Sequence, residues 1–328
     1  MNTTKALTGD EVGILLAAAV HAPSMDNTQP WRFEVAGPVI DVRLDEDLVL
    51  PAADPAGRAI RIGLGAAAFN LRVAAAMLGH ESAFAVTPDP AEPEVVARIY
   101  LSDRSGPITD LAALYGEISR RHTYRGPMLD QAIPPTVISA LTDAAEIEGA
   151  ELHWPADDAT RTLGQLLRQA DDLDLHDDDD RLLERGRWVG GERPHDGVPD
   201  TALGPVPTDP AMVRDLATGL DTPGREHAVF EQRPRIAVLA TADEDEPAWV
   251  LAGLALERVL LTATSSVLAV SFLNQALEYP TLRAQVRDLI GGRSWPQMIL
   301  RIGYPAQAEE HTGRRPWRDA TGWVGLEP

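Results

Sequence analysis

Apolar residues recur at helical spacing in several stretches of the chain. In residues 8–22 they fall on one face, Thr8 is suited to cap the N-terminus with Glu11 three positions later, and Pro23 ends the segment. These features predict a helix there. The same periodicity predicts four further helices, which are Ile62 to Leu78, residues 111–121, Thr136 to Ala145, and Trp249 to Val267.

Alternating or short fully apolar runs predict β-strands between these helices. A Gly37-Pro38 break joins the first two strands into a hairpin. The predicted strands are Trp31 to Ala36, Val39 to Leu44, Val95 to Leu101, Arg235 to Thr241, and Met298 to Tyr304.

The order of these elements suggests that the chain contains the same plan twice. Val12, Leu16 and Ala19 match Val137, Leu141 and Ala144 at an offset of 125, and Gly65, Ala67 and Ala75 match Gly253, Ala255 and Ala263 at an offset of 188. The offsets differ by 63 residues, so extra sequence lies within about residues 150–235. Shared helical periodicity can also produce such matches by chance, so the pattern alone leaves duplication as a hypothesis.

Composition indicates a soluble globular protein with room for about two structural units. The 328 residues are 44% hydrophobic and 24% charged, with a mean hydropathy of -0.15. The net charge of -21 argues against nucleic acid and anionic membranes as partners, because both need a basic face. An N-terminal apolar run of six residues, 14–19, is too short to span a bilayer and lacks a basic start. We expect a cytoplasmic protein.

The inventory of reactive side chains is narrow. The chain has no cysteine, which excludes disulfides, thiol redox chemistry and cysteine-ligated metals. Its eight histidines are scattered, and His176 before an aspartate run is better explained by a solvated acidic loop than by a metal site. We predict no metal.

The segment 22–33, APSMDNTQPWRF, combines polar side chains with a proline-bounded loop. Ser24, Asn27 and Gln29 can donate and accept hydrogen bonds, which suits the edge of a planar heterocycle, and Met25 suits a ring face. A purely structural turn with Trp31 in the core explains the same residues.

Three later segments complete the candidate chemistry. Residues 120–125, RRHTYR, have the cations and the hydroxyl to bind a phosphate. Alternatively, the arginines stand at the C-terminus of a helix and are stabilised there by its macrodipole. Residues 301–305, RIGYP, precede Arg314-Arg315-Pro316-Trp317, which a solvated tail would also explain. The segment Ser271 to Gln275 follows the last long helix as a loop.

Together these segments resemble the nitroreductase-like superfamily of FMN flavoproteins. The resemblance implies an isoalloxazine-contacting loop, an RRSxR-like element for the phosphate and ribityl chain, C-terminal arginines for the phosphate, and a loop beside the flavin nitrogen. It names no catalytic side chain, because the flavin carries the redox chemistry. The implied FMN-binding residues are Pro23, Ser24, Met25, Asn27, Gln29, Pro30, Trp31, Arg32, Arg121, His122, Thr123, Arg125, Asn274, Gln275, Arg314 and Arg315. Asp26 departs from the family, which commonly has His or Gly there.

The distribution of these motifs implies a fused pseudo-dimer. The family usually binds FMN at a homodimer interface, whereas this chain has one loop and one arginine element, in different halves. At the second half's loop position stand Glu148 and Gly149. The arrangement resembles the Acg-type single-chain branch. It implies an α+β (α/β sandwich) fold duplicated in one chain, with central long helices and antiparallel sheets, divided at 1–105 and 106–328.

The implied function is an oxidoreductase that passes hydride from NAD(P)H through FMN to a flat acceptor such as a nitroaromatic or a quinone. The extra sequence in 150–235 is the candidate lid over the flavin. The alternative is a non-catalytic protein that sequesters FMN behind a closed lid. In both cases we expect one FMN per chain and a monomer in solution.

Overall fold

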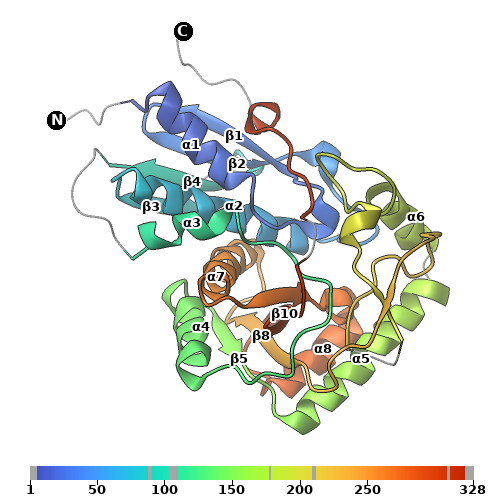
Figure 1. The fold of residues 1–328 in the computed structure, drawn as a ribbon. Helices are drawn as coiled ribbons and strands as arrows, with labels where there is room; N and C mark the ends of the chain where they lie inside the picture. The colour runs from blue at the N-terminus through green and yellow to red at the C-terminus, as the bar shows by residue number, and fades with distance from the viewer. Residues whose placement is uncertain are drawn as a thin grey trace.

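The computed structural model describes residues 6–87, 91–102, 110–176, 179–208, 212–308 and 311–321, and it contains two four-stranded antiparallel sheets (Figure 1). Sheet A has the order β1 (Trp31–Ala36), β2 (Val39–Leu44), β4 (Val95–Leu101), β3 (Ser82–Val86). Sheet B has the order β5 (Glu151–His153), β8 (Arg235–Thr241), β10 (Trp295–Gly303), β9 (Ala269–Phe272).

Each sheet belongs to one copy of the same sequence of elements. In the first half, α1 (Gly9–Ala19), two strands, α2 (Arg58–Met77) and two strands follow one another. In the second half, α4 (Pro135–Ile147), two strands, α7 (Glu246–Ser265) and two strands do the same. The strand orders correspond one to one, so the structure shows the internal repeat. The expected division at residue 105 lies outside the described residues and stays a prediction.

The two long helices α2 and α7 pack against each other at the centre of the molecule (Figure 1). Gly65 and Gly253 lie at the crossing, where a Cβ added to either would come within 2.1 Å of a backbone carbonyl oxygen of the other helix. The two glycines that align at the offset of 188 are therefore what lets the helix backbones approach. By length and composition both helices could cross a membrane, but 83% and 67% of their most apolar windows are buried in the protein, as expected of core helices.

Most predicted elements are present, with differences at their ends. The capping box of Thr8 and Glu11 opens α1 as expected. Helix α7 starts earlier than predicted, because the Asp245 side chain accepts a hydrogen bond from the Ala248 amide. The helix predicted over 111–121 is wrong in extent: a 3-10 turn, η3 (Ala112–Leu114), leads into a single α-turn, α3 (Tyr115–Ile118).

Besides the two-residue pair in the insertion, three strands of sheets A and B were not predicted, and all three are short edge strands. They are β3, β5 and β9, which lie at the outer positions of their sheets. An edge strand is half-buried and short, so its alternation is too brief to separate it from a loop. The strands that periodicity did predict include the central pairs of both sheets.

The extra sequence lies between β5 and β8, and we call residues 154–234 the insertion. The equivalent strands of the first half are joined only by the turn at Gly37 and Pro38. The insertion contains α5 (Asp157–His176), α6 (Asp179–Trp188), η4 (Asp200–Ala202), and the parallel pair β6 (Val206–Pro207) and β7 (His227–Ala228). Helix α5 packs on α8 (Pro280–Leu289) and η5 (Asn274–Leu277), and α6 reaches η1 (Met25–Asn27) in the first half (Figure 1).

Two segments cross between the halves. Residues after α3 run onto sheet B, where Thr123 bridges Val270 of β9. The C-terminal arm, residues 311–321, returns to sheet A, where Thr321 bridges Phe33 of β1 next to η6 (Trp317–Ala320). The 3-10 turn η2 (Glu46–Leu48) follows β2. The candidate phosphate-binding segments are thus carried to the junction of the two halves.

Candidate cofactor site

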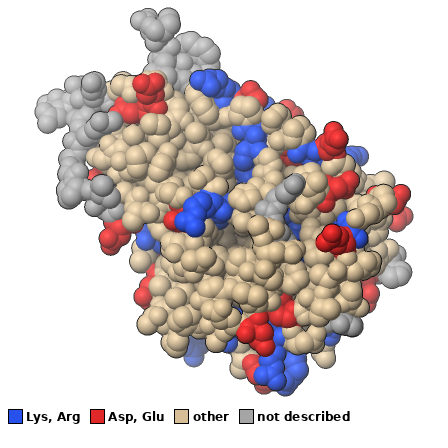
Figure 2. Space-filling view, viewed as in Figure 1, with Lys and Arg blue, Asp and Glu red and all other residues tan. Residues whose placement is uncertain are grey.

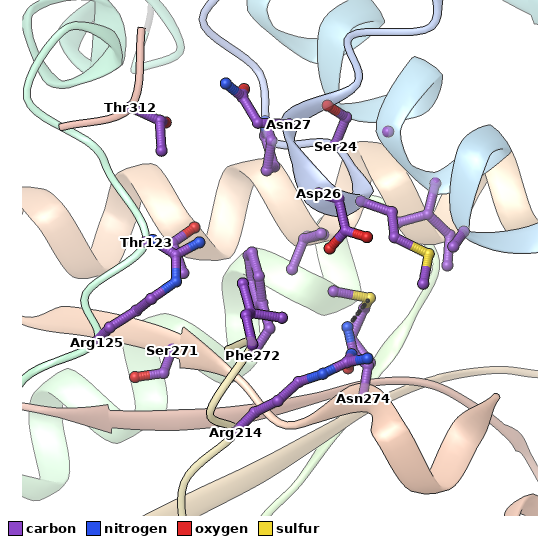
Figure 3. A pocket seen from close by; sticks show the side chains of 18 of the residues that line it. Ser24, Asp26, Asn27, Thr123, Arg125, Arg214, Ser271, Phe272, Asn274 and Thr312 are labelled. Atoms are coloured by element: carbon purple, nitrogen blue, oxygen red, sulfur yellow. Dashed lines mark hydrogen bonds between the residues drawn. The ribbon is translucent and has the colours of Figure 1, made fainter. Parts of the chain in front are cut away.

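A cavity opens at the junction of the two halves and the insertion (Figure 3). It encloses about 1110 Å³ of empty space, its open mouth included, which is large enough for a cofactor-sized ligand. Its walls come from the loop after α1, the start of α2, the segment after α3, the insertion, β9, β10 and the C-terminal arm. The sequence-predicted residues that line it are Pro23, Ser24, Met25, Asn27, Thr123, Arg125, Asn274 and Arg314.

The loop after α1 is a strained turn. Asp26, Asn27 and Gln29 have φ values of 47°, 55° and 55°, a left-handed conformation that costs of order 1–3 kcal/mol per non-glycine residue. The Ser24 hydroxyl accepts a hydrogen bond from the Gln29 amide at 2.9 Å, which closes the turn. Such strain persists only where surrounding contacts enforce it, and the amide side chains supply those contacts.

Asn27 and Gln29 tie the loop to the insertion and to the C-terminal arm. The Asn27 amide donates to the Gly197 carbonyl at 2.8 Å, and its oxygen accepts from Arg314 at 3.0 Å. Gln29 donates to the His195 carbonyl at 2.7 Å and accepts from the Arg315 backbone amide at 2.9 Å. Gln29 is buried and does not line the cavity. Its role in the structure is to hold the walls together.

Arginines concentrate around the cavity despite the acidic chain. Arg314 from the C-terminal arm is half-buried beside Arg121, and desolvation together with that charge lowers its pKa to about 9. The Arg314 Nε is buried with no hydrogen-bond partner in the described part of the chain. Arg125 donates to the Ala202 carbonyl of the insertion at 3.0 Å. Both guanidinium groups line the cavity.

The other cavity arginines are held by protein groups. Arg301 donates to Glu231 and to the Ser271 hydroxyl, and Arg214 of the insertion pairs with Glu278 at 2.6 Å. Arg58 at the start of α2 donates to the Gln297 carbonyl at 2.6 Å, and burial with the nearby Arg283 charge lowers its pKa to about 10. These three fix the walls.

Arg121 does not line the cavity, contrary to the expectation for the phosphate clamp. Its side chain is buried, with its Nε 3.6 Å from a Glu257 oxygen, and it donates to the His21 carbonyl at 3.1 Å. Burial raises the pKa of Glu257 to about 7, and Arg121 opposes that shift. The Arg121 backbone amide still bonds Glu117 at the end of a helical turn, so this side chain turns into the core instead of following Thr123 and Arg125.

Further predicted residues also lie outside the cavity wall. Trp31 is in the core at 1% exposure, Arg32 pairs on the surface with Asp45, and Arg315 pairs with Asp196 of the insertion. The His122 ring stacks on that of His311 with centroids 4.0 Å apart. The remaining two, Pro30 and Gln275, are buried away from the wall. Asn274 lines the cavity, but its side-chain amide donates to the Met298 sulfur and its side-chain oxygen accepts from the Ile299 backbone amide.

Several lining residues were missed by sequence reasoning. Arg58 and Gly63 come from the start of α2, Arg214 from the insertion, and Met298 and Arg301 from β10. Arg58 is unusual where it stands, because a cation in the first turn of a helix is unfavourable beside the positive end of the macrodipole. Such a residue is a candidate for a binding or structural role. At Gly63 a Cβ would lie 3.2 Å from the Pro23 carbonyl oxygen, so the glycine admits the loop.

The corresponding place in the second half is filled. Glu148, at the position equivalent to the loop, is buried and bonded to Arg72 at 2.6 Å and to Arg258 at 2.9 Å. The Arg72 guanidinium also lies over the Phe84 ring at 4.7 Å. An ion cluster thus occupies the position where the first half has an open wall.

Surface charge and possible metal ligands were the other features that the sequence raised. On the face shown in Figure 2, acidic and basic side chains are interspersed, so the net charge is not gathered into one patch on that face. Within the residues that the structure describes, no group of three or more His, Asp or Glu side chains is placed to hold a metal ion. Asp177 and Asp178 of the aspartate run lie outside those residues.

Comparison with known proteins places the chain in a family. No family model matches it. A protein of Mycobacterium tuberculosis (strain ATCC 25618 / H37Rv) named "Putative NAD(P)H nitroreductase Rv3131" is 31% identical over 322 residues, covering 96% of this chain and 92% of the relative. The chain therefore belongs to the NAD(P)H nitroreductase family of that relative, a family of oxidoreductases.

The chain is also similar to a second curated protein and to a solved structure. "Putative NAD(P)H nitroreductase acg" of the same strain is 29% identical over 316 residues, covering 94% of this chain and 95% of the relative. A crystal structure of a nitroreductase with bound FMN from Desulfitobacterium hafniense DCB-2 aligns with a TM-score of 0.42 and 12% identity, covering 64% of this chain and 97% of the other.

Proposed function

We propose that this protein is an FMN-dependent oxidoreductase that takes hydride from NAD(P)H and passes it to a flat acceptor such as a nitroaromatic or a quinone. The observation that carries the proposal is the junction cavity, whose walls join the loop of one half to the arginines of the other. The family names of the relatives support the hydride donor.

The two ends of the cavity differ in a way that fits FMN. Thr123, Arg125 and Thr312 gather toward one end (Figure 3). Arg314, which also lines the cavity, donates to the Thr312 hydroxyl at 2.8 Å. Hydroxyls and guanidinium groups suit a phosphate, and the unpartnered Nε of Arg314 has hydrogen-bonding capacity to spare. We assign these residues to the phosphate, in place of the Arg121 and Arg315 of the sequence expectation.

The other end fits a flat ring. Ser24, Asp26 and Asn274 lie there in the same view (Figure 3). Met298 contacts the Asn274 amide at 3.3 Å, and Met25 and Ile62 also line the cavity. Methionine and aliphatic side chains suit a ring face, while hydroxyl and amide groups suit its edge. FMN supplies the hydride-accepting chemistry when bound, and the residues of this chain bind and orient it.

The first test is binding, with a matched pair of arginine variants. Arg125→Ala removes a cavity guanidinium, whereas Arg120→Ala removes an exposed one that pairs with Glu117. Fluorescence titration of the flavin-free protein with FMN should show weaker binding for Arg125→Ala and unchanged binding for Arg120→Ala. Equal affinity of the two variants would contradict the assignment.

The second test is turnover. NADH or NADPH is mixed anaerobically with the FMN-loaded protein in a stopped-flow instrument, and flavin absorbance is followed; a quinone or a nitroaromatic is then added. We expect the flavin to bleach and then to recover. Flavin that neither donor bleaches within minutes would refute the enzyme proposal.

A second candidate function is FMN sequestration without turnover. The observation that favours it is the closure of the insertion on the loop. The Gly197 backbone amide donates to the Asn27 carbonyl at 3.1 Å, the Asn27 side chain donates to the Gly197 carbonyl at 2.8 Å, and Arg315 pairs with Asp196 at 2.8 Å. If the insertion stays closed, dithionite will reduce the bound flavin while NADH and NADPH do not. Asp196→Asn, which weakens the closure, should then restore reduction by the nucleotides.

A further inference from the structure

Asp26 is the acidic side chain that the strained loop places in the cavity. It lines the cavity wall, and in Figure 3 its carboxyl group points into the space between the loop and Asn274. Its φ of 47° and ψ of 22° put the backbone in the left-handed region. The backbone amide of Asn27 donates to the Ser24 carbonyl at 3.1 Å, and that of Thr28 donates to the Met25 carbonyl at 3.1 Å. These two bonds flank Asp26 and fix the direction of its side chain.

The other acidic groups near the cavity are already committed. Glu278 pairs with Arg181 at 3.0 Å and Arg214 at 2.6 Å, and Asp174 pairs with Arg181 and Arg185. In contrast, none of the described residues donates a hydrogen bond to the Asp26 carboxyl oxygens at bonding distance. Its hydrogen-bonding capacity is therefore directed to whatever occupies the cavity.

Charges approach Asp26 from every element around it, and burial outweighs them. Arg214 and Arg185 of the insertion and Arg125 of the crossing segment lower its pKa, and Glu278 raises it. Arg58, Arg301 and Arg314 line the same cavity from α2, β10 and the arm. Burial is the largest influence and raises the pKa of Asp26 above that of an ordinary aspartate. The group thus keeps its proton to higher pH than an exposed carboxyl.

We propose that Asp26 is the proton donor for the acceptor that is reduced in this cavity. The inference rests on the proposed function, because it assumes that reduced flavin and acceptor meet beside the loop. A positioned acid contributes typically 10²–10⁴-fold to the rate of a step that needs its proton.

The step balances with a quinone as acceptor. FMN bound by the cavity residues would supply the hydride from its anionic reduced form, would be left neutral and oxidised, and the quinone would receive that hydride. The Asp26 carboxyl gives its proton to the quinone oxygen, so a neutral hydroquinone and the Asp26 carboxylate result. The carboxylate then recovers a proton from solvent through the cavity mouth. One negative charge is present on each side.

Asp26→Asn tests the proposal, because asparagine has the same shape and tolerates the left-handed backbone, yet cannot supply the proton. Asp45→Asn is the matched control, since Asp45 pairs with Arg32 on the surface, outside the cavity. The bound flavin is reduced with dithionite, so that its oxidation by a quinone is measured without a nucleotide donor. We expect Asp26→Asn to slow this oxidation by about 100-fold or more, and Asp45→Asn to leave it unchanged.

The pH dependence provides a second readout. In the unaltered protein, oxidation should slow as pH rises through the pKa of Asp26, and in Asp26→Asn it should be independent of pH over that range. Carboxyl ¹³C NMR of the flavin-free protein, assigned by loss of the signal in Asp26→Asn, should show Asp26 titrating above an ordinary aspartate. Asp26→Gly, which relaxes the backbone and removes the acid, should repeat the kinetic loss.

The outcomes separate this inference from the proposed function. Asp26→Asn oxidised at the rate and with the pH profile of the unaltered protein would overturn the role of Asp26 while leaving the enzyme proposal standing. Failure of NADH and NADPH to reduce the flavin, with the Asp26 effect still present after dithionite, would overturn only the nucleotide step. Reduced flavin that no quinone oxidises would overturn both.

Discussion

One added methyl group at the crossing of α2 and α7 should destabilise the protein, because the two helix backbones nearly touch there. In Gly65→Ala the new Cβ would lie 2.1 Å from the Val250 carbonyl oxygen and 3.0 Å from the Gly253 Cα. Carbon atoms pack at about 3.5–4.0 Å, so the helices must separate by roughly 1 Å. The obstacles are backbone atoms, which cannot rotate away as a side chain can.

The expected magnitude combines two opposing effects. Overpacking in a core costs typically about 1–3 kcal/mol, and a rigid obstacle favours the upper end. Alanine in place of glycine in a helix returns about 1 kcal/mol. We therefore expect Gly65→Ala to lower the free energy of unfolding by about 2 kcal/mol, and Gly253→Ala, which meets the Ile62 carbonyl oxygen at the same distance, to behave alike.

Urea unfolding followed by circular dichroism measures the effect, with Gly116→Ala as the control. Gly116 lies in α3 and a Cβ there meets nothing within 4 Å, so this variant should be neutral or slightly more stable. FMN affinity should fall in Gly65→Ala, because the cavity walls belong to the two halves that the crossing aligns. A Gly65→Ala protein as stable as the unaltered chain would refute this account of the interface.

Four further predictions follow from the site. Flavin released from purified loaded protein should amount to one FMN per chain, because an ion cluster fills the second position; a ratio near two would contradict this. Arg314→Ala should lose about 1.5–3 kcal/mol of FMN binding by fluorescence titration. Arg121→Ala should instead destabilise the fold by about 1–3 kcal/mol in urea, because the buried Glu257 carboxyl and the His21 carbonyl would be left without their partner. The pKa of Glu257 is raised from 4.5 to about 7, so between these pH values the native state keeps a proton that the unfolded state has lost. The contribution of Glu257 to the free energy of unfolding should therefore fall as pH rises through that window and stay level above it. Urea unfolding at several pH values should show a flatter pH dependence for Glu257→Gln than for the unaltered protein, and the same pH dependence in both would contradict this. Light scattering at micromolar concentration should give a particle near 35.4 kDa, because α2 and α7 satisfy each other within one chain, and a stable particle of twice that mass would contradict the pseudo-dimer interpretation.

Local sequence patterns predicted the elements wherever the pattern was long. The capping box at Thr8 and Glu11, the hairpin around Gly37 and both long helices are present in the structure because each depends on neighbours a few residues away. The edge strands β3, β5 and β9 were missed because each is too short for its alternation to stand out from a loop. The matched glycines Gly65 and Gly253 were visible in the sequence as an alignment, but only the structure shows that each one meets the other helix.

The site was predicted in outline and corrected in detail. The loop and the arginine segments do meet at one cavity, as the motifs indicate. Arg121 and Arg125 are only four positions apart, yet one faces Glu257 in the core and the other lines the cavity. The reason is a change of backbone between them, from a helical turn at Arg121 to an extended segment that bridges β9 at Thr123. Sequence reasoning treated the segment as one clamp and could not locate that change.

By itself the sequence determined the central strands, the long helices, and the segments that carry polar and basic groups, since these are properties of residues close together in the chain, and it left the repeat as a hypothesis that the matching strand orders then showed. The tertiary structure alone decided which of those groups share a cavity. Asn27 meets Gly197 and Arg314, and Arg214 of the insertion joins the wall near Asp26, across separations of more than 150 residues. Contacts of that range depend on how the two halves and the insertion pack, and packing is a property of the whole chain rather than of any local pattern.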